Sequence, residues 1–260
     1  MKIDWIHLTK QYDQTLGSRL GLLDFSASIQ TGNTVVLGEK GAGKSTLLRL
    51  TSTRMIPDDG RIVFTINSDS AFIWSKSHVR ASEFSNINLL NEKMSYVPKV
   101  KRLDKDTAVE MDLKHRAYAT HVSNPKKRVV EAIAKWGLAA YRHTPLHHLQ
   151  GEVLNRYLLA HSLISDPLIW ILDEPTLELD EMSTRLLCYE LQQRHTQRIT
   201  LIATSDMHLA ECADDLILLD RGMCRRYGKK KLLTAGVREG TVAAWYKAMQ
   251  VFTRVKSSHP

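Results

Sequence analysis

Apolar and polar residues alternate in the first part of the chain, which is the pattern of half-buried strands. Residues 1–8 alternate loosely and predict an edge strand, and residues 23–29 carry apolar side chains at every second position. The β-branched run 34–37 predicts a buried strand, and an apolar helical pattern follows it through about residue 52. A Pro-Asp-Asp-Gly turn and a further strand are predicted over residues 57–66.

Helical periodicity dominates the middle of the chain, and buried strands return in its last third. The predicted helices span residues 107–122, 126–136, 153–163 and 182–195. The predicted strands span residues 168–172, 199–203 and 216–219, and two segments are compatible with short strands, at 71–74 and 94–97. This order predicts an α/β fold, in which a mixed parallel sheet and an antiparallel β subdomain receive an inserted α-helical subdomain.

We expect four segments along the chain: a core, an insert, the rest of the core and a tail. Their predicted bounds are 1–98 for the first part of the core, 99–163 for the helical subdomain, 164–235 for the second part of the core and 236–260 for a helical tail. The tail carries apolar residues at helical spacing, namely Val242, Trp245, Met249 and Phe252. We expect this helix to pack on its own core, with a dimer or partner contact as the alternative.

Composition narrows the class of protein. Of 260 residues, 43% are hydrophobic and 25% charged, as in ordinary globular proteins. The net charge of +8 is compatible with an anionic membrane surface, nucleic acid or an acidic partner, but the basic clusters lack interleaved aromatics, which favours a solvated face. No run of 18 apolar residues occurs, so no membrane span is expected. Three cysteines without C-x-x-C spacing favour a reducing compartment over a zinc site.

A glycine-rich segment lies between the predicted strand at 34–37 and the helix behind it. It fits the pattern G-x-x-x-x-G-K-[ST] of phosphate-binding loops (P-loops), with the residues Gly38, Glu39, Lys40, Gly41, Ala42, Gly43, Lys44, Ser45 and Thr46. The backbone N–H groups of such a loop form an anion site together with the helix N-terminus. Lys44 is placed to reach the β- and γ-phosphates, and Ser45 to ligate Mg²⁺. A plain glycine-rich turn is the alternative, but the flanking strand and helix favour binding of a nucleoside triphosphate.

Two carboxylates follow the apolar strand at 168–172. In nucleotide-binding α/β folds the ligand lies at the carboxyl edge of the parallel sheet, where this strand ends. Asp173 is therefore placed to hold Mg²⁺ through water, opposite Ser45, and Glu174 to polarise a water molecule that attacks the γ-phosphate. A helix N-cap after a strand is the alternative for this pair, and the P-loop upstream favours the catalytic interpretation.

These motifs resemble the nucleotide-binding subunit of an ATP-binding cassette (ABC) transporter. The resemblance rests on Gly38–Thr46, on the lead-in at 165–167 and on Ile171–Thr176, and it extends from Tyr12 to about Gly222. It implies the P-loop ATPase fold, ATP and Mg²⁺ as ligands, and an adenine ring stacked on Tyr12. Catalytic roles for Lys44 and Glu174 agree with it.

Three positions depart from the pattern of this family. The signature motif, normally Leu-Ser-Gly-Gly-Gln, aligns with Leu149–Val153, where Gly151 is kept but Glu152 brings a negative charge toward a phosphate. Such a repulsion costs about 1–4 kcal/mol unless a cation intervenes. Lys99 stands at the Q-loop glutamine; it can reach a phosphate but cannot ligate Mg²⁺. Ser205 stands at the switch histidine, and His208 is a conceivable substitute beside the alternative of a surface histidine.

The resemblance therefore implies an ATP-binding subunit that powers or gates a membrane translocator, with weak or partner-dependent ATP hydrolysis. The implied partners are a membrane-spanning subunit, docked near residues 75–125, and a second ABC ATPase subunit, with a hetero-pair favoured and a homodimer as the alternative. The implied location is the cytoplasmic face of the cell membrane, and no specific nucleic acid is expected. The competing hypotheses are a soluble ABC-type ATPase acting on nucleic acid or ribosomes, and a non-hydrolysing regulatory subunit that senses ATP.

Overall fold

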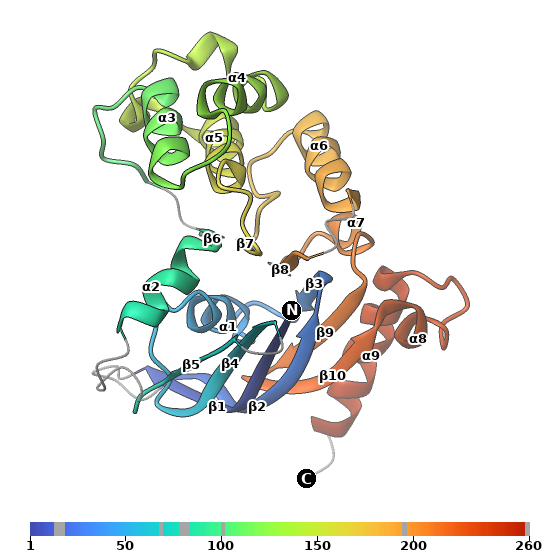
Figure 1. The fold of residues 1–260 in the computed structure, drawn as a ribbon. Helices are drawn as coiled ribbons and strands as arrows, with labels where there is room; N and C mark the ends of the chain where they lie inside the picture. The colour runs from blue at the N-terminus through green and yellow to red at the C-terminus, as the bar shows by residue number, and fades with distance from the viewer. Residues whose placement is uncertain (13–18, 68–69, 78–83, 100–101, 194–196, 258–260) are drawn as a thin grey trace.

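Two sheets organise the chain in a computed structural model that describes residues 1–12, 19–67, 70–77, 84–99, 102–193 and 197–257 (Figure 1). One sheet is antiparallel, in the order β2-β1-β4-β5, and the other has the order β10-β9-β3-β8-β7-β6. Their strands are β1 (Lys2–Tyr12), β2 (Arg19–Gln30), β3 (Gly32–Leu37), β4 (Asp59–Asn67), β5 (Ser70–Ser75), β6 (Met94–Val97), β7 (Ile169–Asp173), β8 (Ile199–Ala203), β9 (Asp215–Asp220) and β10 (Met223–Lys229).

Helices connect and cover the strands. They are α1 (Lys44–Thr51), α2 (Phe84–Glu92), α3 (Val109–Ala119), α4 (Pro125–Lys135), α5 (Gly151–Leu163), α6 (Glu181–Gln192), α7 (Met207–Ala210), α8 (Lys230–Thr234) and α9 (Val242–Ser257), with 3-10 turns η2 (Ala139–Tyr141) and η3 (Leu146–His148). The predicted helices at 107–122, 126–136 and 153–163 correspond to α3, α4 and α5, with ends that differ by at most three residues. No helix within the described residues is long and apolar enough to cross a lipid bilayer.

The prediction of an edge strand over residues 1–8 is wrong. β1 lies inside the antiparallel sheet, paired with β2 on one side and β4 on the other. Its apolar residues Ile3, Trp5 and Leu8 are fully buried, and the polar residues between them lie on the other face. Alternation of side chains reports the two faces of a strand and not its two backbone edges, so the pattern could not tell an interior strand from an edge strand.

β3 lies inside the parallel part of the second sheet, which has the order β9-β3-β8-β7-β6. It pairs in parallel with β8 and β9, while β7 pairs in parallel with β8 and β6. Residues 34–37 are buried, which is why this stretch of β3 reads as a continuous apolar run and not as an alternating one. Because these strands are parallel, the segments that follow β3, β7 and β8 meet at one edge of the sheet.

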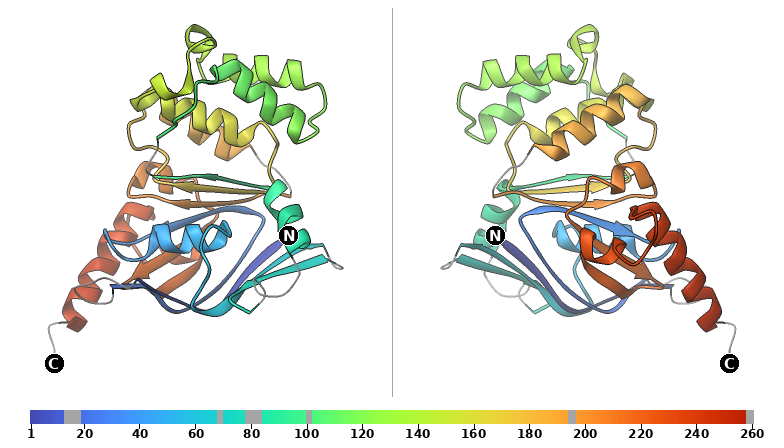
Figure 2. Two further views of the ribbon diagram at one scale, coloured as in Figure 1. Left: turned by 90° about the vertical axis from the view of Figure 1, so that its left-hand side faces the viewer. Right: turned by 90° about the vertical axis from the view of Figure 1, so that its right-hand side faces the viewer.

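α1 lies between the two sheets (Figure 2). Its buried residues Leu47, Leu48 and Leu50 share one apolar cluster with Phe25 of the antiparallel sheet and Ile171 of the parallel sheet. A second cluster, on the other face of the parallel sheet, contains residues of β3 together with α3, α4 and α5. The N-terminus of α1 is therefore held rigidly at the sheet edge where the loops converge.

Candidate nucleotide site

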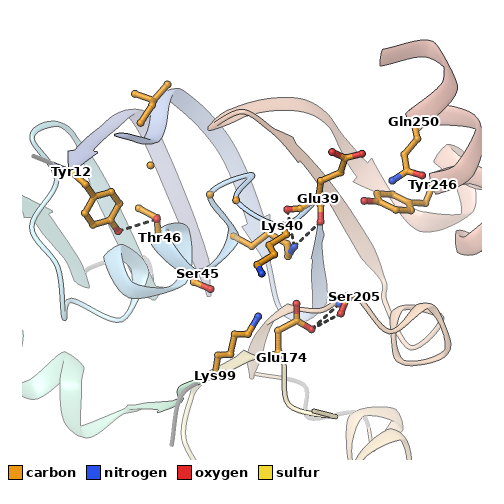
Figure 3. Close-up of a pocket in the computed structure, with 16 residues that line it drawn as sticks. Tyr12, Glu39, Lys40, Ser45, Thr46, Lys99, Glu174, Ser205, Tyr246 and Gln250 are labelled. Atoms are coloured by element: carbon orange, nitrogen blue, oxygen red, sulfur yellow. Dashed lines mark hydrogen bonds between the residues drawn. The ribbon is translucent and has the colours of Figure 1, made fainter. Parts of the chain in front are cut away.

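The predicted phosphate-binding loop joins β3 to α1 at the carboxyl edge of the parallel sheet (Figure 3). Gly43, which precedes α1, has φ 106°, and a Cβ atom built there would lie 2.3 Å from the carbonyl oxygen of Gly21 in β2. No other residue fits at this position, because a side chain would have to displace the backbone of β2. The glycine therefore lets the loop turn closely against the antiparallel sheet before the helix begins.

The loop borders a cavity of about 910 Å³, a size typical of small-molecule sites. Twelve of the predicted site residues line it: Tyr12, Gly38, Glu39, Lys40, Gly41, Gly43, Lys44, Ser45, Thr46, Lys99, Glu174 and Ser205. Ala42 lines a smaller neighbouring cavity on the outer side of the loop. Asp173 is buried beneath Ser45, and Gly151 is an exposed residue at the start of α5 that does not line the cavity.

Lys44 is held by the loop itself. Its Nζ donates to the carbonyl oxygens of Gly38 (2.6 Å) and Glu39 (3.3 Å). Burial lowers the pKa of Lys44, the charge of Glu174 opposes this shift, and the charge of Lys99 adds to it. The ammonium group is thus partly desolvated and rests on neutral oxygens, which favours its interaction with an incoming anion.

Ser45 and Asp173 meet where the sequence predicts a metal. The Ser45 hydroxyl donates to Oδ1 of Asp173 over 3.0 Å, and Oδ2 of Asp173 is buried without a partner. Burial raises the pKa of Asp173, whereas the hydrogen bond from Ser45 lowers it. A buried unpaired carboxylate oxygen beside a hydroxyl fits Mg²⁺, a hard cation that prefers oxygen ligands.

Glu174 is held by hydrogen bonds to Ala203, at the end of β8, and to Ser205, which follows that strand. Its φ of 49° lies in the left-handed region, and its N–H donates to the carbonyl of Ala203 over 2.8 Å. One carboxylate oxygen, Oε2, accepts two hydrogen bonds from Ser205, from the backbone N–H (2.9 Å) and from the hydroxyl (3.0 Å). The serine at the switch position therefore binds the carboxylate that the sequence predicts to be catalytic. His208 is exposed on α7 and is not part of the cavity wall.

Glu152 does not stand as an uncompensated charge. Its Oε1 lies 3.1 Å from Nε of Arg156, an ion pair one helical turn apart on α5, and it accepts a hydrogen bond from the Ser183 hydroxyl over 3.1 Å. Asp180 caps α6 by accepting from the Ser183 N–H over 2.7 Å. Arg156 is therefore the cation that offsets the negative charge of Glu152. Through its bond to Ser183, Glu152 also joins the start of α5 to the start of α6.

Tyr12 forms one end of the cavity. Its hydroxyl is 3.0 Å from Oγ1 of Thr46 and 3.4 Å from Sδ of Met55, so the ring is fixed against the start of α1. Gly21 makes room for the ring, because a Cβ at Gly21 would lie 2.7 Å from it. Tyr12 therefore offers an aromatic ring for a base at the end of the cavity away from α9 (Figure 3).

Four lining residues were not predicted: Leu20, Gly21, Tyr246 and Gln250. Leu20 and Gly21 belong to β2, which begins at Arg19, whereas the sequence predicted this strand only over residues 23–29. The tail helix was predicted to pack on its own core, and the burial of Val242 and Trp245 confirms this. Tyr246 and Gln250 lie one turn apart on the same helix, and this spacing is the one signal that could have placed them together on a face.

Comparisons with known proteins agree with this geometry. A family model described as "ABC transporter" matches residues 22–177. The chain is 31% identical to the nickel import ATP-binding protein NikO of Rhodobacter capsulatus, over 73% of this chain and 75% of that protein. It is 30% identical to the lipoprotein-releasing system ATP-binding protein LolD 2 of Chlorobaculum tepidum, over 85% and 90% of the two chains.

Solved structures show the same fold. The structure of an ATP-binding subunit of an ABC transporter superposes with a TM-score of 0.79 at 18% identity, and covers 96% of this chain and 100% of that chain. A dimeric structure of a bacterial ABC transporter cassette has a TM-score of 0.71 at 20% identity, over 87% and 98% of the two chains.

Proposed function

Because the chain belongs to the ABC transporter family and is an ATP-binding subunit of such a transporter, we propose that its cavity binds Mg²⁺-ATP and that the chain alone hydrolyses it slowly. The base stacks on Tyr12, and the phosphates lie along the loop at 38–46 with Lys44 as their main cation. Ser45 and Asp173 hold Mg²⁺. The unpaired buried Oδ2 of Asp173, beside the Ser45 hydroxyl, is the observation that supports the metal.

Slow hydrolysis follows from what surrounds Glu174. Glu174 is the group that can accept a proton from an attacking water, and Ser205 already donates two hydrogen bonds to one of its oxygens. Lys99, on the cavity wall, offers charge but no oxygen to a metal or to that water. When bound, Mg²⁺ would neutralise phosphate charge. The protein's own assistance to the water is reduced, and each such group typically supplies about 10²–10⁴-fold.

The chain works with two partners in this proposal. A membrane-spanning subunit docks near residues 75–125, where Leu89 of α2 and Met111 and Tyr118 of α3 expose about half of their surfaces (51%, 50% and 51%). This contact places the chain at the cytoplasmic face of the cell membrane. A second ABC ATPase subunit with a regular signature completes the site, since Glu152 is committed to Arg156 and Ser183.

In this proposal, successive segments of the chain have different roles. The segments 1–98 and 164–235 form the nucleotide-binding core, the segment 99–163 transmits its state to the membrane partner, and the tail 236–260 closes the core. The position of the cavity between loops from both core segments supports this division.

Equilibrium binding of Mg²⁺-ATP to the parent and to Lys44→Ala tests the proposed function. We expect at least about tenfold weaker binding by the variant, because its lost charge-assisted bonds are each worth about 1.5–3 kcal/mol. Lys76→Ala is the matched control, since Lys76 is exposed and lies outside this cavity. Equal binding by the parent and Lys44→Ala would refute nucleotide binding at this loop.

A non-hydrolysing ATP sensor is the second candidate, because Ser205 holds the carboxylate that hydrolysis requires. Glu174→Gln separates the two functions. It removes residual turnover from a hydrolysing subunit and leaves ATP binding intact, whereas a pure sensor shows the same background release of phosphate with and without the substitution.

A further inference from the structure

The carboxyl-terminal helix α9 forms part of the wall of the nucleotide cavity. Tyr246 and Gln250 line it next to Glu39 and Lys40 of the phosphate loop. The same two side chains, with Met249, also line a second cavity of about 260 Å³ on the outer side of the loop. The loop is thus bordered by α9 from outside, at the end of the cavity away from Tyr12 (Figure 3).

Packing fixes the position of α9. Val242 is fully buried and Trp245 is 3% exposed, in the apolar cluster that includes β3 residues. The Val242 N–H donates to Oε1 of Glu211 over 2.6 Å, and Thr241 accepts from the N–H of Ala244 over 3.2 Å. The helix packs against α7 and α8. Its first turns are therefore anchored, and Tyr246 and Gln250 present a fixed surface to the loop.

Glu39 and Lys40 point in opposite directions (Figure 3). The carboxylate of Glu39 lies on the side of Tyr246 and Gln250, while the ammonium group of Lys40 points toward Lys99 and Glu174 inside the cavity. Because the two residues are adjacent in the loop, a contact that holds the Glu39 side chain outward also fixes the loop backbone from which the Lys40 side chain extends inward.

The negative charge of Glu39 affects the pKa of Tyr246. Burial raises the pKa of Tyr246, a side-chain hydrogen bond from Gln250 lowers it, and the Glu39 carboxylate raises it again. The neutral, protonated phenol is therefore favoured beside a carboxylate. A phenol hydroxyl is a hydrogen-bond donor and a carboxylate is an acceptor, so the two groups suit each other.

We propose that Tyr246 and Gln250 are positioning residues of the nucleotide site: they hold Glu39 on the outer side of the phosphate loop and so direct Lys40 onto the bound phosphates. This inference rests on the proposed binding of ATP. With the base on Tyr12, the last phosphate lies at the end of the cavity lined by Lys40, Lys99 and Glu174. α9 therefore strengthens the binding of ATP more than that of ADP.

The test compares the dissociation constants of ATP and ADP for the parent, Tyr246→Phe and Gln250→Leu. We expect each variant to bind ATP about threefold to tenfold more weakly, which is within the range of one ordinary hydrogen bond. The binding of ADP should change less than twofold. Tyr227→Phe is the matched control, because Tyr227 is an exposed tyrosine of β10 outside the cavity.

A double-mutant cycle with Lys40→Ala decides whether the effect passes through the loop. If Tyr246 acts through Lys40, adding Tyr246→Phe to Lys40→Ala costs no further ATP affinity. Additive losses, equal losses for ATP and ADP, or no loss in either variant would each overturn the inference. Lys44→Ala in the same series keeps the two proposals apart: if it abolishes ATP binding while the α9 variants bind normally, only the role of α9 fails.

Discussion

Ser205 and Glu174 form the most informative pair of residues in the site. Both donors of Ser205 point at one oxygen of Glu174, while the other oxygen accepts no bond from Ser205. Two hydrogen bonds to one oxygen hold the direction of a carboxylate. The carboxylate is therefore retained in a fixed orientation, and a water molecule near the phosphates has to use the oxygen that Ser205 leaves open.

The role of Tyr12 in binding the base can be tested by substituting this residue alone. Tyr12→Ala should weaken ATP binding about fivefold or more, because stacking of a base on an aromatic ring is worth about 1–3 kcal/mol. Tyr12→Phe keeps the ring and loses the contact with Thr46, so it should lose less than about threefold. Titration with a fluorescent ATP analogue measures both. Binding that is unaffected by Tyr12→Ala would show that the base lies elsewhere.

Single residues also mark the limit of what the sequence predicts about the site. The spacing of the phosphate loop and of the carboxylates at the end of β7 placed nine residues around one cavity, and the family resemblance added Tyr12, Lys99 and Ser205. The same spacing could not show that Arg156 neutralises Glu152 or that Ser205 binds Glu174, because both depend on side-chain directions at the ends of α5 and β8. Tyr246 and Gln250 were missed since no nucleotide motif extends into the tail.

Among whole elements, those with a continuous apolar run or with buried apolar residues at helical spacing were predicted best. β3, β7 and β8 are buried on both faces, and α3, α4 and α5 each pack an apolar face on the core. β10 was missed because it is largely exposed and polar, and its position depends on pairing with β9. The short helices α7 and α8 have too few residues for a period to develop.

A polar cluster joins α3 to α5 and gives the helical part a dependence on pH. The Tyr157 hydroxyl donates to Oδ2 of Asp112 over 2.5 Å, and Nε2 of His161 lies 3.4 Å from the same oxygen. Burial lowers the pKa of His161 to about 4; Asp112 opposes this shift, while Arg116 and Lys105 add to it. The imidazole is thus neutral in the folded protein at neutral pH.

The stability of the chain should fall as the pH drops from about 6.5 toward 4, because the unfolded chain then binds a proton that folded His161 does not. We expect a loss of up to about 1 kcal/mol between pH 7.5 and pH 5.5, discounted for the partial exposure of the ring. This corresponds to a few degrees in the thermal midpoint.

Thermal unfolding of His161→Gln over the same pH range checks this prediction. The variant should show a shallower decline than the parent, while His208→Gln, which changes an exposed histidine of α7, should follow the parent. A parent and a His161→Gln variant with the same slope would show that this histidine does not set the pH dependence.

At the scale of the whole molecule, the two sheets and the helical layer bring distant segments to one edge. The cavity combines residues from β1 and β2, the loop after β3, the segments after β6, β7 and β8, and α9. The order of predicted elements was sufficient for the fold class, since strands and helices alternated as in P-loop ATPases. It was not sufficient for the place of α9, which depends on the packing of Val242 and Trp245.

We propose a subunit that holds its nucleotide well and assists hydrolysis poorly. Steady-state hydrolysis of Mg²⁺-ATP by the purified chain alone tests this most directly, in a sample whose ATP occupancy is measured by equilibrium dialysis. We expect a nearly saturated site that turns over less than about one ATP per second, at the low end of enzyme rates. A saturated chain that hydrolyses several ATP molecules per second without a partner would contradict the account.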